Sequence, residues 1–291
     1  MLLEGGYIAN VSHHLTANDL TLNQVAPQNM GSPVAAQLLR PFPQFNNVTW
    51  INPSIGNSTY HGGFVRAEKR MHGGLAFLAH YTFSKFLDDV EASNEFGTTG
   101  SYMDAYNRRL DKGLSGSDVP QRLVVTALYE LPGLKGHQAA NRLLGGWKAG
   151  LLETAESGPT FTVITAANTT NAFPAGALRP HLLRNAGLSG DQRSVTRWFD
   201  TAAFANPAAF TFGNSTRGGL RGARVLTTDL TLEKRFAVTE SWKFDLRAEF
   251  YNVFNHATFN IPGFTLGAAD FGIVSSARNP RSAQLAARVS F

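Results

Sequence analysis

The side chains of this sequence that could do chemistry are few, and their spacing matches no catalytic or metal-binding motif. His13 and His14 are adjacent and could ligate a metal, but they fall in a segment expected to be an external loop, where solvated histidines are the stronger interpretation. Asp104, Asp111 and Asp118 recur every seven residues, which is not the D-x-[DN]-x-[DN]-G spacing of a calcium-binding loop. We therefore expect these aspartates to make loop hydrogen bonds and turns.

Signatures of the common enzyme classes are absent from the sequence. It contains no Gly-x-Ser-x-Gly elbow, no P-loop and no dinucleotide-binding fingerprint. Asp88 and Asp89 are neighbours, so on a strand they would face opposite ways and could not share a site. The chain has no cysteine, which excludes disulfides, thiolate metal sites and cysteine nucleophiles. We predict that the protein is not an enzyme and uses no cofactor or metal.

The composition of the chain argues against further classes of protein. Charged residues make up 16% of the 291 residues, below the roughly 25% of soluble domains. The net charge is +5, but lysine and arginine are scattered, so no nucleic-acid-binding surface is predicted. No stretch approaches the ~20 consecutive apolar residues of a membrane-spanning helix. The first residues also lack the pattern of a secretion signal.

The elements that would position any site are predicted to be strands, because apolar side chains alternate with others in many segments. The clearest alternating segments are 73–87, 121–131, 224–236, 242–254 and 283–291, with weaker ones at 2–11, 60–70 and 146–165. Each is about as long as the 9–11 residues of a tilted transmembrane strand, or longer, whereas globular strands cluster near 5–6.

The predicted connections alternate in length. Short ones fall at 71–74, 132–146 and 237–241, and long ones at about 12–59, 88–120, 166–223 and 256–280. This alternation is typical of outer-membrane barrels, which have short periplasmic turns and long extracellular loops. We therefore predict an all-β fold over residues 1–291: an antiparallel transmembrane β-barrel portion of about eight long strands, in contact with lipid in the outer membrane of a Gram-negative bacterium.

Two groups of residues could carry function in such a barrel. Charges on the polar faces of two strands are expected to face the lumen: Asp229, Glu233, Arg235, Asp245, Arg247 and Glu249. Cross-strand ion pairs that stabilise register are their favoured role, ahead of docking a plug or lining a transport path. Aromatic residues in or beside the loops could contact an external ligand or pack among themselves: Trp50, Tyr60, Phe199, Phe204, Phe210 and Phe212.

The tail "AQLAARVSF" is predicted to be the closing strand. Its apolar face is formed by Leu285, Ala287, Val289 and Phe291. An unpaired strand edge is not tolerated in lipid, so the final strand must close against a neighbour. A terminal phenylalanine would then lie in the aromatic girdle at the periplasmic interface.

Two C-terminal segments, "KFDLRAEFYNVFNHATFNIPG" and "FGIVSSARNPRSAQLAARVSF", resemble the end of the barrel in TonB-dependent outer-membrane receptors. The likeness is greatest to the Oar-like branch, whose members often carry a carboxypeptidase-regulatory-like domain. "GGLAFLAHYTFSKFLDD", "DVPQRLVVTALYELPG" and "LGGWKAGLLETAESGPTFTV" are also similar to family segments. The resemblance implies that the barrel assembly machinery reads the closing strand as an assembly signal. It also implies a plug domain and TonB as partners in the intact receptor.

The resemblance implies a barrel of about 22 strands, preceded by a signal sequence, a TonB box and a plug domain. On this reading the chain is the C-terminal part of a receptor for a large or scarce ligand, and its sheet stays open. The alternatives are a self-standing eight-stranded outer-membrane barrel with a structural or adhesion role, and a soluble β-rich enzyme or lectin.

Overall fold

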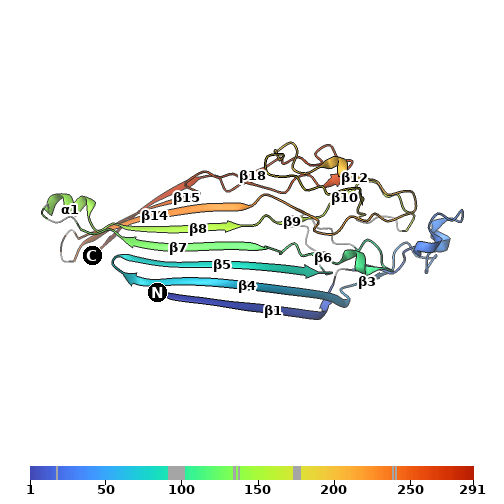
Figure 1. Ribbon diagram of the computed structural model, residues 1–291, viewed down its shortest axis with the longest axis horizontal. Coiled ribbons are helices and arrows are strands. Elements are labelled where there is room, and N and C mark those ends of the chain that lie inside the picture. Colours follow the sequence, from blue (N-terminus) through green and yellow to red (C-terminus); the bar gives the residue numbers. More distant parts are fainter. Residues whose placement is uncertain are drawn as a thin grey trace.

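The computed structural model is dominated by one antiparallel sheet (Figure 1). The structure describes residues 1–17, 19–90, 102–133, 136, 138–172, 178–237, 239 and 241–291. The long strands, in their order across the sheet, are β1 (Leu2–Thr16), β4 (Ser54–His72), β5 (Leu75–Asp88), β7 (Gln121–Glu130), β8 (Lys148–Glu156), β14 (Val225–Ala237), β15 (Lys243–Tyr251) and β19 (Ser282–Ser290). The predicted all-β fold with eight long antiparallel strands is confirmed.

The connections between these strands alternate as predicted. The four long connections, 17–53, 89–120, 157–224 and 252–281, leave one end of the sheet, which we call the loop end. The short connections and both termini lie at the other end, which we call the turn end (Figure 1). The tightest turn joins β4 to β5 through Gly73 and Gly74, with φ of +63° and +79°. Two positive φ angles favour glycine in a two-residue hairpin turn of type I′.

Three details of the strands differ from the prediction. β1 and β4 extend beyond the expected 2–11 and 60–70, so His13 and His14 lie on β1 rather than in a loop. The cause is non-local, because β4 supplies pairing partners as far as Thr16. β8 ends at Glu156 instead of continuing to residue 165, since Pro159 follows closely and has no N–H to donate to the ladder.

A short helix in the connection between β7 and β8 was not predicted. α1 (Gln138–Leu144) begins in a segment rich in alanine and leucine, which are strong helix formers. It ends before Gly146, whose φ of +70° is typical of a residue that terminates a helix. No helix among the described residues is long and apolar enough to cross a membrane.

The register divides the sheet into a charged face and an apolar face. Partners opposite each other in an antiparallel ladder point to the same side, so the pairs Glu4–Arg66, Lys148–Glu233 and Arg235–Asp245 all lie on one face. We call this side the charged face. The opposite side, the apolar face, includes large exposed side chains: Tyr7 (68%), Phe83 (60%) and Leu285 (76%). An exposed apolar surface of this extent is typical of contact with lipid or with another protein.

The sheet does not close. β1 pairs only with β4, and β19 pairs only with β15, so each leaves one edge without a partner among the described residues. The buried core is therefore not enclosed by the sheet. It lies mainly in the connections at the loop end, as described below.

Candidate functional site

The described residues of the four long connections form a packed body at the loop end, which we call the loop cap (Figure 1). Its regular elements are short: β2 (Leu20–Thr21), β3 (Thr49–Trp50), β6 (Gly113–Leu114), β9 (Thr160–Phe161), β10 (Ile164–Thr165), β11 (His181–Leu182), β12 (Phe204–Ala205), β13 (Leu220–Arg221), β16 (Thr258–Phe259), β17 (Thr265–Leu266), β18 (Ala277–Arg278), and the 3-10 turns Pro27–Asn29, Ala36–Leu39, Arg108–Asp111 and Thr201–Ala203. The ladder of β10 with β17 joins segments of two different connections, and β6 pairs with the end of β5.

An aromatic cluster forms the centre of the loop cap. Phe199 is 1% exposed and packs against Phe161, Phe204 and Phe271, with ring centroids 5.1–5.8 Å away. Phe199 and Phe204 therefore pack within the loops. Trp50 is the contrasting case, since 48% of it is exposed. Packing among the loop aromatics therefore describes Phe199 and Phe204, whereas Trp50 is exposed enough to contact an external ligand.

Buried ion pairs join the connections to one another. The Arg179 guanidinium contacts the Asp111 carboxylate at 2.6 Å, and their side chains are only 2% and 5% exposed. Arg179 also donates hydrogen bonds to the carbonyl oxygens of Ser215 (2.9 Å) and Leu110 (2.7 Å). Charge-assisted hydrogen bonds that satisfy the buried donors make this arrangement strong, and it ties the second long connection to the third.

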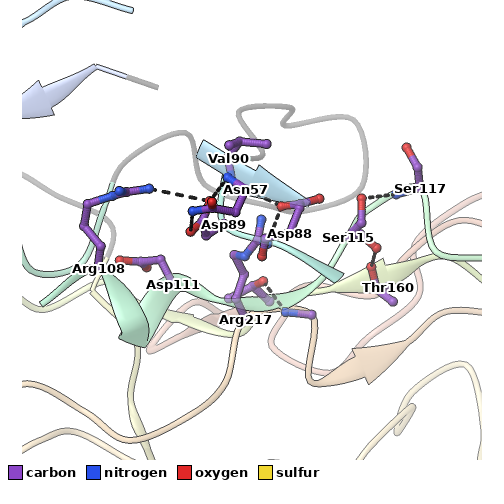
Figure 2. Close-up of polar contacts among 12 residues, drawn as sticks. Asn57, Asp88, Asp89, Val90, Arg108, Asp111, Ser115, Ser117, Thr160 and Arg217 are labelled. Atoms are coloured by element: carbon purple, nitrogen blue, oxygen red, sulfur yellow. Dashed lines mark hydrogen bonds and ion pairs between the residues drawn. The ribbon is translucent and has the colours of Figure 1, made fainter. Parts of the chain in front are cut away.

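A second pair ties the loop cap to the sheet (Figure 2). Arg217 donates hydrogen bonds to the carboxylate and to the backbone oxygen of Asp88, the last residue of β5. The neighbouring Asp89 accepts hydrogen bonds from the backbone N–H (2.6 Å) and side-chain amide (3.0 Å) of Asn57, and Arg108 lies 3.5 Å away. In these contacts the two adjacent aspartates have different partners, as predicted, although Asp89 lies just beyond the end of β5 and not on the strand.

Tyr102 completes the surroundings of Asp89. The Arg108 guanidinium lies over the Tyr102 ring, 5.1 Å from its centroid, and the Tyr102 hydroxyl donates to the Asp89 backbone oxygen at 3.1 Å. Burial raises the pKa of the Tyr102 phenol, and the nearby Arg108 opposes that rise. The phenol is held as a neutral hydrogen-bond donor.

The three regularly spaced aspartates make the loop hydrogen bonds that were predicted. Besides Arg179, Asp111 accepts from the Met103 backbone N–H at 3.2 Å. Asp104 accepts from Gln24, which lies in the first long connection, at 2.7 Å. Asp118 accepts from the backbone N–H of Phe86 at 2.6 Å and pairs with Arg221. Each carboxylate has its own partners, and among the described residues no three His, Asp or Glu side chains converge as metal ligands.

The predicted charges on β14 and β15 lie together on the charged face. Arg235 contacts the Asp245 carboxylate through two nitrogen atoms, at 2.6 and 3.1 Å. Arg247 contacts Glu249 at 2.6 Å along the same strand. Glu233 is the register partner of Arg247 without forming an ion pair to a described residue.

Asp229 has a different role from the other five charged residues predicted to face the lumen. Its carboxylate accepts a hydrogen bond from the backbone N–H of Asn252, just beyond β15, at 2.8 Å. Asp229 therefore fixes the chain where β15 enters the loop cap. Whether the charged face lines a lumen stays a prediction.

Sequence reasoning missed ion pairs on the same face between other strands. Lys148 contacts Glu130 at 2.9 Å, Arg122 contacts Glu156 at 3.4 Å, and Arg66 contacts Glu4 at 3.5 Å. These residues lie in weakly alternating segments or on strands with few charges, so only the register reveals the pairs. Ion pairs thus link β1 to β4, β7 to β8 and β14 to β15.

The C-terminal strand ends in an aromatic contact. The ring of Phe291 stacks on Trp242, with centroids 5.1 Å apart and planes inclined by 29°. Leu285, Ala287 and Val289 are the register partners of Ala248, Leu246 and Phe244 on the apolar face. Their role as an assembly signal stays a prediction.

The polar contacts described above hold the loop cap together and join it to the sheet. The carboxylates of Asp88, Asp89, Asp104, Asp111 and Asp118 are bound to arginines, amides or backbone N–H groups. None of these contacts pairs a nucleophile with a general base.

Comparison with known proteins gives one family. A family model described as "Outer membrane beta barrel domain" matches residues 1–284. No curated protein and no solved structure matches the chain.

Proposed function

The chain belongs to the outer membrane β-barrel domain family and is located in the bacterial outer membrane; from that premise we propose that it is a barrel segment of a receptor for TonB-dependent uptake of a large or scarce ligand. In this proposal the turn end faces the periplasm and the loop cap faces the outside, as in outer-membrane barrels generally. The apolar face contacts lipid, and the charged face contacts the water-filled lumen or a plug domain.

The observation that carries the proposal is the open sheet. β1 and β19 each have one edge without a strand partner among the described residues. In lipid every backbone polar group must be satisfied, so each edge must pair with a strand. The two edges either pair with each other, which closes eight strands, or pair with further strands, as we propose. Additional strands would make the barrel wider than eight strands, and the widest barrels are transporters with a plugged lumen.

The loop cap supports the same proposal. A receptor must present a preorganised surface to a scarce ligand, because ordering loops upon binding reduces affinity. Ion pairs such as Arg179–Asp111 fix two of the long connections, 89–120 and 157–224, to each other and to β5 before any ligand arrives. A self-standing eight-stranded barrel with an adhesion role would also benefit from ordered loops, but it would have to pair β1 with β19.

Disulfide trapping separates the two proposals, and the absence of native cysteine makes the background clean. Pairs combining cysteine at Leu3, Gly5 or Tyr7 with cysteine at Leu285, Ala287 or Val289 all place both thiols on the apolar face. A wider barrel predicts no cross-link for any combination under oxidation in the membrane. The control pair Ala248→Cys with Leu285→Cys joins register partners and should cross-link. An efficient β1–β19 cross-link would establish a closed eight-stranded barrel and overturn the wider one.

The transport role has its own test. Mass spectrometry of spent medium would compare a strain lacking this protein with one lacking TonB. Compounds that stay unconsumed without the protein should also stay unconsumed without TonB. Normal consumption of those compounds in the strain lacking TonB would contradict TonB dependence.

A further inference from the structure

The loop cap contains a cavity of about 780 Å³ above the ends of β8, β14 and β15. Its walls come from four segments that are distant in sequence: 157–158, 190–198, 221–224 and 256–259. Cavities of roughly 300–1,000 Å³ are typical of sites for small organic ligands. The volume is therefore suitable for a ligand much larger than an inorganic ion.

The charge of this cavity is one-sided. Arg193, Arg221 and Arg224 line it, and no aspartate or glutamate does. Arg221 is neutralised by Asp118. Within the described part of the chain, neither Arg193 nor Arg224 forms an ion pair with a carboxylate. Two guanidinium charges are thus left without an anion.

Acidic residues beside the lining in sequence are engaged elsewhere. Glu156 contacts Arg122 at 3.4 Å. The Ser189 hydroxyl donates to the Asp191 carboxylate and lowers the pKa of that group. Neither carboxylate lines the cavity or forms an ion pair with Arg193 or Arg224, although Arg193 donates a hydrogen bond to the Leu188 carbonyl oxygen at 3.0 Å.

Aromatic rings form another part of the wall. The Trp198 ring meets Phe259 edge to face, with centroids 6.3 Å apart, and Arg193 lies 5.4 Å from the Trp198 centroid. Two hydrogen bonds of 2.9 Å hold Trp198 in place. Its indole Nε1–H donates to the Arg221 carbonyl oxygen, and its backbone N–H donates to the Gly272 carbonyl oxygen. A fixed indole beside two guanidinium groups suits a flat ring that bears a negative charge.

We propose that this cavity binds an organic anion with a planar ring, whose charged group is held by Arg193 and Arg224 and whose ring packs against Trp198 and Phe259. The inference rests on the proposed receptor function and names the class of ligand that the external surface would capture. Arginine suits the charged group because its planar fork can donate two hydrogen bonds to one carboxylate.

Isothermal titration of the purified full chain in detergent micelles tests the site with three probes: 2-naphthoate, the neutral 2-naphthamide, and acetate. We expect 2-naphthoate to bind at least about tenfold more tightly than either other probe, since only it has both ring and charge. The double variant Arg193→Gln, Arg224→Gln should bind 2-naphthoate no better than 2-naphthamide. Both arginines are exposed, so the variant should fold, which heat-modifiable gel mobility would verify.

The matched control is Lys85→Gln with Lys112→Gln, which removes two positive charges at another cavity, between β5 and the loop cap, whose lining includes Arg221 but neither Arg193 nor Arg224. This control should bind 2-naphthoate as the unaltered chain does. Equal affinity for 2-naphthoate and 2-naphthamide, unchanged binding by the arginine variant, or no saturable binding at millimolar concentration would each overturn the proposal. Because the titration involves neither TonB nor transport, its outcome is independent of the spent-medium experiment.

Discussion

Arg179 and Asp111 lie 68 residues apart in sequence, yet they form an ion pair at 2.6 Å that is almost completely shielded from solvent. The pair joins two long connections of the loop cap and is satisfied by further hydrogen bonds to backbone oxygens. The pair shows how contacts between distant residues hold the loop cap together. The connections fold onto one another through buried charges as well as through the aromatic cluster around Phe199.

Breaking this pair should loosen the loop cap while leaving the sheet intact. Asp111→Asn leaves the Arg179 guanidinium buried without its anion, which costs about 3–5 kcal/mol. Hydrogen-exchange mass spectrometry should show faster exchange in peptides covering 102–116 and 178–186. The control Glu130→Gln removes half of a solvent-exposed pair with Lys148 and should cost less than about 1 kcal/mol. Equal, small effects of the two substitutions would show that the buried pair does not hold the loops.

The two faces of the sheet should respond differently to charge. Ala286 and Ala287 are neighbours on β19, but Ala286 is the register partner of Arg247 and Ala287 that of Leu246. Ala287→Arg places a charge on the apolar face and should destabilise the protein in lipid vesicles by about 2–4 kcal/mol. Ala286→Arg, the matched control, places it on the charged face and should cost less than about 1 kcal/mol. Urea titration in vesicles measures both, and a larger loss for Ala286→Arg would reverse the assignment of the faces.

Phe291 should matter for assembly beyond its contact with Trp242. Removing either ring abolishes the stack, which contributes about 0.5–1.5 kcal/mol. If the terminal aromatic is also read during assembly, Phe291→Ala should lower the heat-modifiable fraction in the outer membrane several-fold more than Trp242→Ala does. Equal losses in the two variants would assign Phe291 a packing role alone.

The strands were predictable because their cause is local. In β15, Phe244, Leu246 and Ala248 alternate with charged residues, and this period predicts both the strand and its two faces. The alternation of short and long connections followed from the same strands. The extension of β1 to His13 and beyond was not predictable in this way, because its cause is pairing with β4, as where His13 contacts Asn57, 44 residues later.

The contacts that hold the loop cap together could not be derived from the sequence. Asp88 and Arg217 are 129 residues apart, and nothing in the residues around either one identifies the other. Asp104, Asp111 and Asp118 were singled out by their spacing, but their partners Gln24, Arg179 and Arg221 were not. Arginines in loops that are rich in glycine, asparagine, serine and threonine are the one local sign that such partners exist.

Cysteine labelling in intact cells tests the central claim most directly, namely that the loop cap faces the outside and the turn end faces the periplasm. Leu183 in the loop cap is 62% exposed and Leu144 in α1 at the turn end is 64% exposed, so each accepts a single cysteine with little disturbance. A membrane-impermeant maleimide should label Leu183→Cys in intact cells and label Leu144→Cys only after the outer membrane is permeabilised. Labelling of Leu144→Cys together with protection of Leu183→Cys in intact cells would contradict the account.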